Sequence, residues 1–559
     1  MIIGQPDADP GDTDTSSVIP DSKAKARLAA QRAPLRLRWA LPVALVGGLL
    51  LAGAFAPIGA WPLAVVGPAL LVVTLSGRSL RGAFTVGLVF GLAFFLPLLA
   101  FVVNVAWFAW VALAIASALI FAVFAIAQRL LLNLRWWPPA VAGWWVAAEA
   151  FRDRWPWGGF PWGRLAMSQA GLPTQGWVAI FGPPTLTFVV ALTGTTLAWV
   201  LLAALTGGRA GRWRRTAIAA TAFAATAGVS CLPAALPLDP VPANAKTAVV
   251  AAIQGNVPRA RSLQTLLNDV EVTQNHVTAT DKLATEVAAG TLPAPDLVVW
   301  PENSTSIDPT VYPPLYDEIA SAAGTIDRPI LVGAVLQDPL RNAGVLWLPG
   351  KGPTTTYVKR RLVPFGEYIP FRSLISKFTS LTQLQPQDFV PGNKTVVFDV
   401  GQIKLGDVIC YEVAFDDLVR SEVDAGSNLI ALQSNDATYE REGPITQESG
   451  QQLAMARIRA IEFDRSVVLA STTGYSAIIA PDGQLMTTSG VWTQAELEAR
   501  VPLLTYTTLA DRLGAWPEWA IVAATTLALG LAIAQTGAAR RRQRGLRSDD
   551  SPAGVAEGR

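Results

Sequence analysis

Hydrophobic and polar positions divide the 559-residue chain into two parts with different patterns. Long apolar runs fill residues 40–236, whereas residues 245–505 alternate short apolar runs with polar stretches. An apolar helix of about 17–25 residues crosses the hydrocarbon core of a bilayer. The chain therefore predicts eight spanning helices, of which the second and fifth are short enough to indicate tilted or partly re-entrant segments. We place them near residues 39–56, 61–75, 83–103, 109–128, 137–151, 180–206, 216–236 and 516–537.

The basic residues between these spans predict the orientation of the chain. Short cytoplasmic loops carry an excess of Lys and Arg. If the N-terminus lies inside, the Arg-containing loops after the second, fourth and sixth spans all face the cytoplasm, together with the basic C-terminal tail. The loops near 57–60 and 104–108 contain no Lys or Arg and face outward. The polar domain then lies outside a multi-pass plasma-membrane protein whose two termini are cytoplasmic.

The same pattern predicts five regions. The first residues are acidic and polar, as in disordered segments, and no short apolar region with a small-residue cleavage site follows them. We expect a disordered cytoplasmic tail (1–38), a seven-span membrane domain (39–237), an extracytoplasmic domain (245–505), a C-terminal spanning helix (516–537) and a basic cytoplasmic tail (538–559).

The outer loop between the fifth and sixth spans is the exception to the charge pattern, because it contains arginines. Its sequence, R-D-R-W-P-W-G-G-F-P-W-G-R, also holds several tryptophans. One interpretation is an aromatic belt at the membrane interface, where Trp is enriched. The other is a lipid-binding loop in which Trp157, Trp162 and Arg164 contact acyl chains and phosphate. The sequence leaves both interpretations open.

Composition supports the membrane assignment and limits the chemistry. Only 15% of the residues are charged, against about 25% in a soluble domain. A net charge of +2 gives no indication of nucleic-acid binding. With one histidine, two cysteines and no CxxC pattern, we expect no metal site, no cofactor and no disulfide framework.

The polar domain has the pattern of a layered α/β or α+β fold. Short runs rich in Val, Ile and Leu predict buried strands, and one longer stretch has apolar residues at helical spacing. The strands are expected at 247–254, 296–300, 329–336, 405–410 and 428–433, and the helix at 447–464.

Reactive side chains follow two of these strands, at the positions where sites in α/β sheets gather. Glu302 follows the second strand, and Cys410 ends the fourth. Lys359 lies between them in the segment Y-V-K-R-R-L-V-P-F-G-E, which also contains Glu367. A thiol attacks as the thiolate, and without a suitable histidine a buried carboxylate must take its proton. Glu302 as base, Cys410 as nucleophile and Lys359 as oxyanion partner fill the three roles.

Each of these residues also has an ordinary structural interpretation. A cysteine at the end of an apolar strand is most often a small core residue, and Glu302 and Lys359 on their own resemble surface charges. A disulfide between Cys231 and Cys410 is a further alternative, since exported cysteines in even number often pair. Catalysis is favoured because the three types occur together.

Three motifs resemble the nitrilase superfamily, and in particular the bacterial apolipoprotein N-acyltransferases. They are V-V-W-P-E-N-S (298–304), K-R-R-L-V-P-F-G-E-Y-I-P (359–370) and G-D-V-I-C-Y-E (406–412). F-P-W-G-R-L-A-M-S-Q (160–169), S-N-D-A (434–437) and M-A-R-I-R-A-I-E (455–462) also resemble family motifs, as does the arrangement of spans around one outer domain. The resemblance implies an αββα sandwich with Glu302, Lys359 and Cys410 as the catalytic triad. It implies Glu367 as a supporting acid, with Tyr411 and Glu412 beside the nucleophile.

The resemblance also implies a two-step reaction and its substrates. Cys410 would take an acyl chain from a membrane phospholipid as a thioester. The α-amine of the S-diacylglyceryl cysteine of an apolipoprotein would then accept the chain, which gives a triacylated lipoprotein. The chain departs from the family at Thr438 and at A-S-T-T-G (470–474), which puts lid and donor preference in question. Its high Ala, Arg and Gly content indicates an actinobacterial source, in which the family is sometimes coupled to a polyprenol-phosphate mannosyltransferase. A separate cytoplasmic partner of that kind is a further hypothesis.

Two other functions remain as alternatives. A membrane-tethered amidase or carbon–nitrogen hydrolase would use the same triad with water as the acceptor. A transporter or scaffold with a degenerate catalytic domain would use none of it. Seven spans before the domain favour a lipid substrate over a simple tether.

Overall fold

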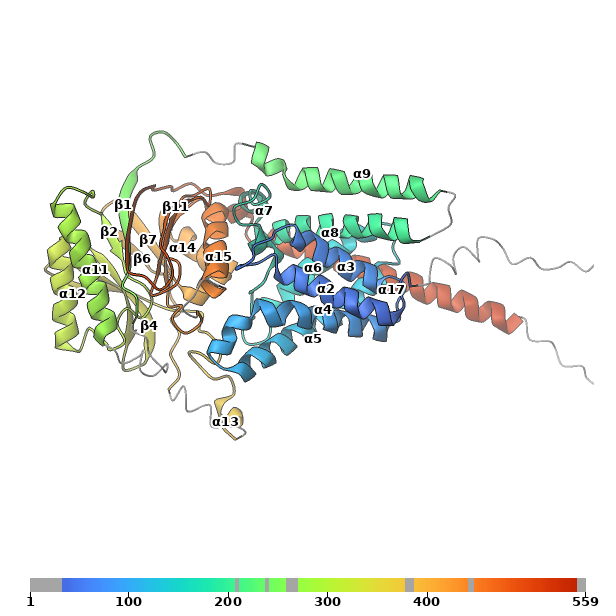
Figure 1. Ribbon diagram of the computed structural model, residues 1–559, viewed down its shortest axis with the longest axis horizontal. Coiled ribbons are helices and arrows are strands. Elements are labelled where there is room, and N and C mark those ends of the chain that lie inside the picture. The colour runs from blue at the N-terminus through green and yellow to red at the C-terminus, as the bar shows by residue number, and fades with distance from the viewer. Residues whose placement is uncertain are drawn as a thin grey trace, which may run out of the picture.

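The computed structural model describes residues 33–206, 211–236, 241–257, 270–377, 387–440 and 447–549. The predicted disordered tail falls almost wholly outside these residues, as does the end of the basic C-terminal tail. Figure 1 shows two parts that pack end to end, a bundle of long helices and a domain built on β-sheets.

Helices form near all eight positions that were predicted to span the membrane. They are α2 (Leu37–Ala52), α3 (Leu63–Leu75), α4 (Leu80–Leu98), α5 (Trp107–Leu131), α6 (Trp137–Arg152), α8 (Pro183–Leu205), α9 (Arg212–Ser230) and α17 (Trp516–Asp549). Among the described helices, α4, α5, α8 and the segment Trp516–Ala538 of α17 are long and apolar enough to cross a membrane. Helices α2 and α3 are apolar but shorter. The count of eight spans therefore stays a prediction.

Helices α6 and α9 depart furthest from simple spanning helices. Helix α6 carries two buried polar side chains, Glu149 and Arg152. Glu149 accepts hydrogen bonds from the Thr187 hydroxyl at 2.8 Å and from the Leu165 backbone N–H at 2.9 Å. Helix α9 is rich in Ala and Thr, is largely exposed, and lies beside α8 at the edge of the bundle (Figure 1).

Glycines allow the first helices to approach one another closely. A Cβ on Gly48 of α2 would lie 2.3 Å from the Phe90 carbonyl oxygen of α4. A Cβ on Gly87 of α4 would lie 2.5 Å from Ala125 Cβ of α5. Small residues at such crossings are typical of helix packing in membranes.

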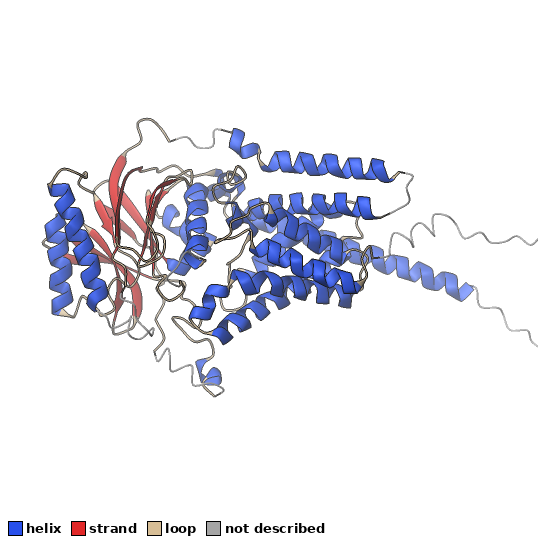
Figure 2. Cartoon of the chain, viewed as in Figure 1, coloured by secondary structure: helices blue, strands red, loops and turns tan. Residues whose placement is uncertain are grey.

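The second part contains two six-stranded sheets, whose strands are red in Figure 2. The first sheet has the order β12-β1-β2-β3-β4-β5 and the second β11-β10-β9-β8-β7-β6. Strands β1, β2 and β3 are parallel, as are β7, β8 and β9, and the outer pairs are antiparallel. The strands are β1 (Thr247–Gln254), β2 (Leu297–Val299), β3 (Ile330–Leu336), β4 (Arg341–Leu348), β5 (Gly352–Val358), β6 (Val397–Val400), β7 (Ile403–Ile409), β8 (Leu429–Ser434), β9 (Ser466–Ser471), β10 (Ala477–Ile479), β11 (Leu485–Thr488) and β12 (Ala495–Pro502).

Helices cover the outer face of each sheet, which confirms the predicted αββα sandwich. Helices α11 (Val270–Ala288) and α12 (Pro313–Ile326) pack on the first sheet, and α14 (Asp416–Asp424) and α15 (Glu448–Phe463) on the second. Apolar side chains such as Val250, Val299 and Leu405 fill the space between the sheets. A short helix, α13 (Arg372–Ile375), projects from the segment after β5 (Figure 1).

The membrane helices pack directly on the helical face of the second sheet. One apolar core runs from Phe94 of α4 to Met455 of α15 and Val408 of β7. The segments that connect the two parts are η1 (Ala100–Asn104), η2 (Leu165–Gln169), α7 (Trp177–Phe181), η3 (Leu232–Ala235) and α16 (Leu509–Leu513). Because the core is continuous, the two parts are not joined by a flexible tether.

Candidate active site

The three candidate catalytic residues lie just beyond the ends of three strands. Glu302 follows β2, Lys359 follows β5, and Cys410 follows β7. Strands β2 and β5 belong to the first sheet and β7 to the second, so both sheets contribute to the site. The end of the sandwich thus brings together residues that are far apart in the sequence.

The Lys359 ammonium lies between two carboxylates. Its Nζ is 2.8 Å from Glu302 Oε1 and 2.9 Å from Glu367 Oε1, and its side chain is 1% exposed. Asn342 of β4 donates its Nδ2 to the same two oxygens, at 2.6 and 2.8 Å. The other oxygen of Glu302 accepts the backbone N–H of Asn435 at 3.0 Å. These bonds fix the base and the ammonium relative to each other.

Burial and the neighbouring charges set the protonation of the triad. Burial raises the pKa of Glu302 above its usual 4.5, although Lys359 opposes the shift. Burial acts to lower the pKa of Lys359, but Glu302 and Glu367 outweigh it and hold that pKa well above 10.5. Burial and the Glu302 charge raise the pKa of Cys410 well above 9.0, with Lys359 opposing. The resting thiol is therefore protonated, and its attack on a carbonyl requires a base.

Cys410 lies on a strained turn at the start of η5 (Cys410–Ala414). Its φ of +52° is in the left-handed region, which costs about 1–3 kcal/mol for a residue with a side chain. The side chain is 7% exposed, and Gln452 of α15 donates its Nε2 to Sγ at 3.6 Å. Both cysteines are free, and Cys231 is exposed at the end of α9, so the disulfide alternative is wrong.

Glu412 ties this turn to the segment that carries Lys359. It is fully buried, and one of its oxygens accepts the backbone N–H groups of Arg360 at 2.7 Å and Arg361 at 2.9 Å. The other oxygen accepts the Tyr357 hydroxyl and the Ile409 backbone N–H, both at 2.9 Å. Burial raises the pKa of Glu412, and the backbone donors act in the opposite direction. The side chain is thus a structural support for the nucleophile.

Tyr411 connects the nucleophile to the predicted outer loop of the membrane part, residues 152–164. Its hydroxyl donates to the Gly159 carbonyl oxygen at 3.0 Å. Its ring stacks with those of Phe160 and Trp162, with centroid distances of 6.2 and 6.4 Å. Trp162 in turn donates its Nε1 to Gln451 of α15 at 2.6 Å. The loop is therefore part of the support of the active site.

Arg164 extends the same connection through buried ion pairs. Its Nη1 lies 2.6 Å from Asp416, and its Nε 3.3 Å from Asp153. Arg459 of α15 also lies 2.6 Å from Asp416 and donates to the Val413 carbonyl oxygen, inside the nucleophile turn, at 2.8 Å. Burial acts to raise the pKa of Asp416, but the two guanidinium groups outweigh it and hold that pKa well below its usual range.

These contacts separate the three residues predicted to touch lipid. Trp162 and Arg164 are only 4% and 3% exposed. Their side chains contact other protein residues, Trp162 through Gln451 and Tyr411 and Arg164 through Asp153 and Asp416. Trp157 is 50% exposed. We therefore retain the prediction of lipid contact for Trp157 alone.

Several residues around the triad were not singled out from the sequence. Asn435 and Arg459 lie in segments that resemble family motifs, which marks the segments but not the roles of these two residues. Asn342 and Gln452 have no motif around them. The available signal for Asn342 was a polar residue inside an apolar strand, which is costly unless it is hydrogen-bonded.

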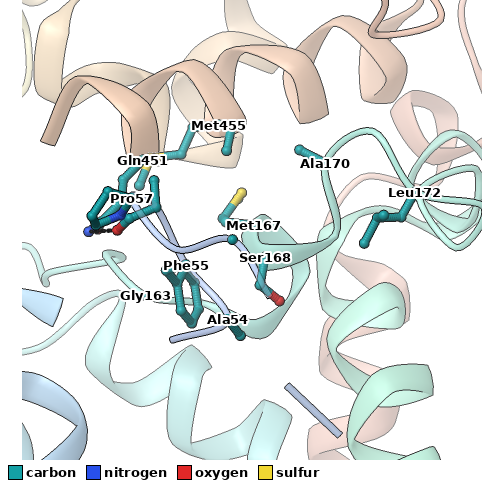
Figure 3. A pocket seen from close by; sticks show the side chains of 13 residues that line it. Ala54, Phe55, Pro57, Gly163, Met167, Ser168, Ala170, Leu172, Gln451 and Met455 are labelled. Atoms are coloured by element: carbon teal, nitrogen blue, oxygen red, sulfur yellow. Dashed lines mark hydrogen bonds between the residues drawn. The ribbon is translucent and has the colours of Figure 1, made fainter. Parts of the chain in front are cut away.

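A small cavity lies between the membrane part and helix α15 of the catalytic domain (Figure 3). It measures about 180 Å³ and lies between the loop after α2, η2 and α15. Phe55, Met167 and Met455 are among its lining side chains, and no described residue that lines it is charged. Gln451 crosses one edge and donates to the Leu98 carbonyl oxygen at 3.1 Å.

Both parts of the chain match known protein families. The family described as "Apolipoprotein N-acyltransferase N-terminal domain" matches residues 47–196, and "Carbon-nitrogen hydrolase" matches residues 249–517. An apolipoprotein N-acyltransferase of Mycolicibacterium smegmatis is 37% identical over 515 residues, which cover 89% of this chain and 86% of that protein. One from Vibrio vulnificus is 26% identical, covering 89% of this chain and 97% of that protein. Among solved structures, an amidase mutant from Nesterenkonia AN1 covers 48% of this chain and 95% of its own, with 17% identity and a TM-score of 0.35. By its membrane part, its sandwich domain and its relatives, the chain belongs to the apolipoprotein N-acyltransferase family.

Proposed function

We propose that this enzyme transfers an acyl chain from a membrane phospholipid to the N-terminal amine of a diacylglyceryl apolipoprotein. The observation that carries the proposal is the position of Cys410. It lies on a turn that the membrane part itself supports, through Tyr411 and the outer loop. Both substrates carry acyl chains, and removing a chain from the bilayer costs about 0.8 kcal/mol per CH₂. A nucleophile beside the membrane helices avoids that cost.

In the first step, Cys410 Sγ attacks the carbonyl carbon of the donor ester while Glu302 accepts the thiol proton. The Lys359 ammonium stabilises the oxyanion of the tetrahedral intermediate. The C–O bond of the ester then breaks, and Glu302 returns the proton to the departing lysophospholipid alkoxide. The product is a thioester on Cys410, and the base is again ionised.

In the second step, the α-amine of the acceptor attacks the thioester. Glu302 accepts a proton from the amine, the C–S bond breaks, and the thiolate leaves. Glu302 then returns this proton to the sulfur, so the enzyme regains its starting state. One base thus serves both halves of a ping-pong reaction.

The chain is a membrane protein. We further propose that it crosses the plasma membrane with both termini in the cytoplasm and the catalytic domain outside. The distribution of arginines between the helices supports this orientation. A polyprenol-phosphate mannosyltransferase partner has no support from the relatives and stays an untested hypothesis.

The test is N-acylation of a diacylated lipopeptide by the purified protein in detergent with phospholipid. Cys410→Ala should abolish the product, and Cys231→Ala is the matched control, because that exposed cysteine lies outside the site. Equal activity of Cys410→Ala and the wild type would contradict the mechanism. If the wild type released free fatty acid and left the lipopeptide unmodified, the chain would be the alternative hydrolase.

A further inference from the structure

A second cleft lies beside Tyr411, between the outer loop and the segment after Lys359. Its volume is about 390 Å³. Its walls combine arginine and aromatic side chains with two glycines of the outer loop. The lining residues include Trp157, Arg360, Arg361, Asp388, Tyr411 and Phe415. Unlike the cavity in Figure 3, this cleft has charged walls.

The cleft lies where the membrane part meets the catalytic domain. Three residues before Trp157 in the chain, Arg154 pairs with Glu518 at the start of α17. The guanidinium carbon of Arg154 is 5.0 Å from the centre of the Trp519 ring. Trp155 and Trp516 are 57% and 78% exposed beside this pair. Tryptophans of this kind mark the headgroup level of a bilayer. The cleft thus shares the outer loop with the exposed Trp155.

Arg361 supplies a guanidinium group with donors to spare. Its Nη2 lies 3.0 Å from Asp417, whose side chain is 67% exposed. Its Nη1 faces Gly158 of the outer loop, 3.6 Å from where a Cβ would stand if that glycine had one. Among the described residues, the guanidinium nitrogens of Arg361 have no other hydrogen-bond partner. A guanidinium carries five N–H donors in a planar fork that matches a phosphate.

The other charges in the cleft are already paired. Arg360 binds Glu422 through Nη2 at 2.7 Å and donates to the Thr395 hydroxyl through Nη1 at 3.1 Å. Asp388 pairs with Arg372. Arg361 is thus the charged group that can exchange an exposed partner for a ligand.

Exposed aromatic rings adjoin the cleft at Trp157, one of its lining residues. Trp157 contacts Phe365 and Phe371 edge to face, with centroid distances of 6.3 and 6.2 Å. All three rings are 49–66% exposed. An exposed aromatic cluster next to a guanidinium whose ion-pair partner is itself exposed suits a molecule that has both a phosphate and acyl chains.

We propose that this cleft binds the phosphoryl headgroup of the donor phospholipid, with Arg361 on the phosphate and Trp157 beside the glycerol and acyl region. The inference rests on the proposed function and deepens it, because it names the part of the donor that is recognised. Tyr411 lines the cleft and directly follows Cys410 in the chain, so the cleft shares a wall with the turn that carries the nucleophile. One of the two interpretations of the loop sequence gave phosphate contact to Arg164, and the structure offers Arg361 instead.

The test uses the full-length Cys410→Ala protein in detergent and native mass spectrometry. The probes are equal amounts of dioleoyl phosphatidylglycerol and dioleoylglycerol, which differ only in the phosphoryl headgroup. We expect phosphatidylglycerol adducts to exceed dioleoylglycerol adducts about tenfold, the factor for one hydrogen bond to a charged group. Arg361→Gln should bring the ratio close to one. Arg328→Gln should leave it unchanged, because that arginine lies in the outermost layer of the sandwich, next to an exposed Asp327.

If the ratio of phosphatidylglycerol to dioleoylglycerol adducts did not change in Arg361→Gln, the proposal would be overturned. An equal fall of this ratio in Arg361→Gln and Arg328→Gln would overturn it too. Inorganic phosphate is the third probe, and adducts as abundant as those of the phospholipid would indicate a small-anion site and also overturn it. None of these results depends on acyl transfer, because Cys410→Ala cannot form the thioester. Failure of the proposed function would appear separately, as the absence of an acyl mass on the wild-type protein.

Discussion

Arg164 allows a direct test of whether the outer loop supports the active site or binds lipid. Its guanidinium is 3% exposed and lies 2.6 Å from Asp416 and 3.3 Å from Asp153. Removing one partner of a buried ion pair costs about 3–5 kcal/mol, because a charge is left buried without compensation. Asp416 keeps Arg459 at 2.6 Å, so we expect the lower end, about 3 kcal/mol, for Arg164→Met.

Thermal unfolding in detergent, followed by tryptophan fluorescence, measures this loss. For a domain of 150–250 residues, 1 kcal/mol shifts Tm by about 2–4 °C, so Arg164→Met should lower Tm by about 6–12 °C. Arg328→Met is the control, since its ion pair is exposed and worth about 1 kcal/mol or less. Asp416→Asn should lower the unfolding free energy less in the Arg164→Met variant than in the wild type, because Arg164 and Asp416 interact directly.

A different pattern would refute this reasoning. If Arg164→Met melted with the control and lost activity only through weaker binding of the phospholipid, the lipid-contact interpretation of this residue would be correct. The burial of its guanidinium would then be wrong.

Three further predictions concern the triad and its supports. Glu302 is a base only when ionised, and its pKa is raised above 4.5. The rate of thioester formation, measured by rapid-quench mass spectrometry, should therefore rise with pH through a limb centred above pH 4.5. A limb at or below pH 4.5 would contradict the assignment of Glu302 as the base. Glu367→Gln removes one of the two carboxylates that bind the Lys359 ammonium. It should slow thioester formation about 10- to 100-fold, which corresponds to the free energy of one hydrogen bond between charged groups. An unchanged rate would show that Glu367 is not needed to position the ammonium. Tyr411→Phe keeps the stacked ring and loses the bond to Gly159, so its unfolding free energy should fall by about 1 kcal/mol, and Tyr411→Ala should lose about 3 kcal/mol or more. Equal losses in the two variants would show that ring stacking contributes nothing.

The sequence predicted the elements whose signal is local. Strand 247–254 coincides with β1, and the helix expected at 447–464 is α15, Glu448–Phe463. The strand is a short continuous apolar run and the helix has apolar residues at helical spacing, and neither signal depends on a distant contact. The αββα arrangement came from the family motifs, since periodicity alone predicted only a layered α/β or α+β domain.

The sequence did not predict contacts between distant segments. Arg164 and Asp416 are 252 positions apart, and an arginine in a loop next to a membrane gives no sign that it will be buried. The same holds for Asn342, whose two carboxylate partners come from other segments. The buried Glu149 inside α6 could not be predicted for the same reason, because its partner is the backbone N–H of Leu165 at the start of η2.

The central claim is that Cys410 carries the acyl chain between lipid and protein. Intact-mass spectrometry of the wild-type protein incubated with phospholipid alone tests it most directly. We expect one added acyl mass, located on Cys410 and absent from Cys410→Ala, which disappears when a diacylated lipopeptide is added and reappears on that peptide. An unmodified enzyme that still acylates the lipopeptide, or an acyl mass on another residue, would contradict the account.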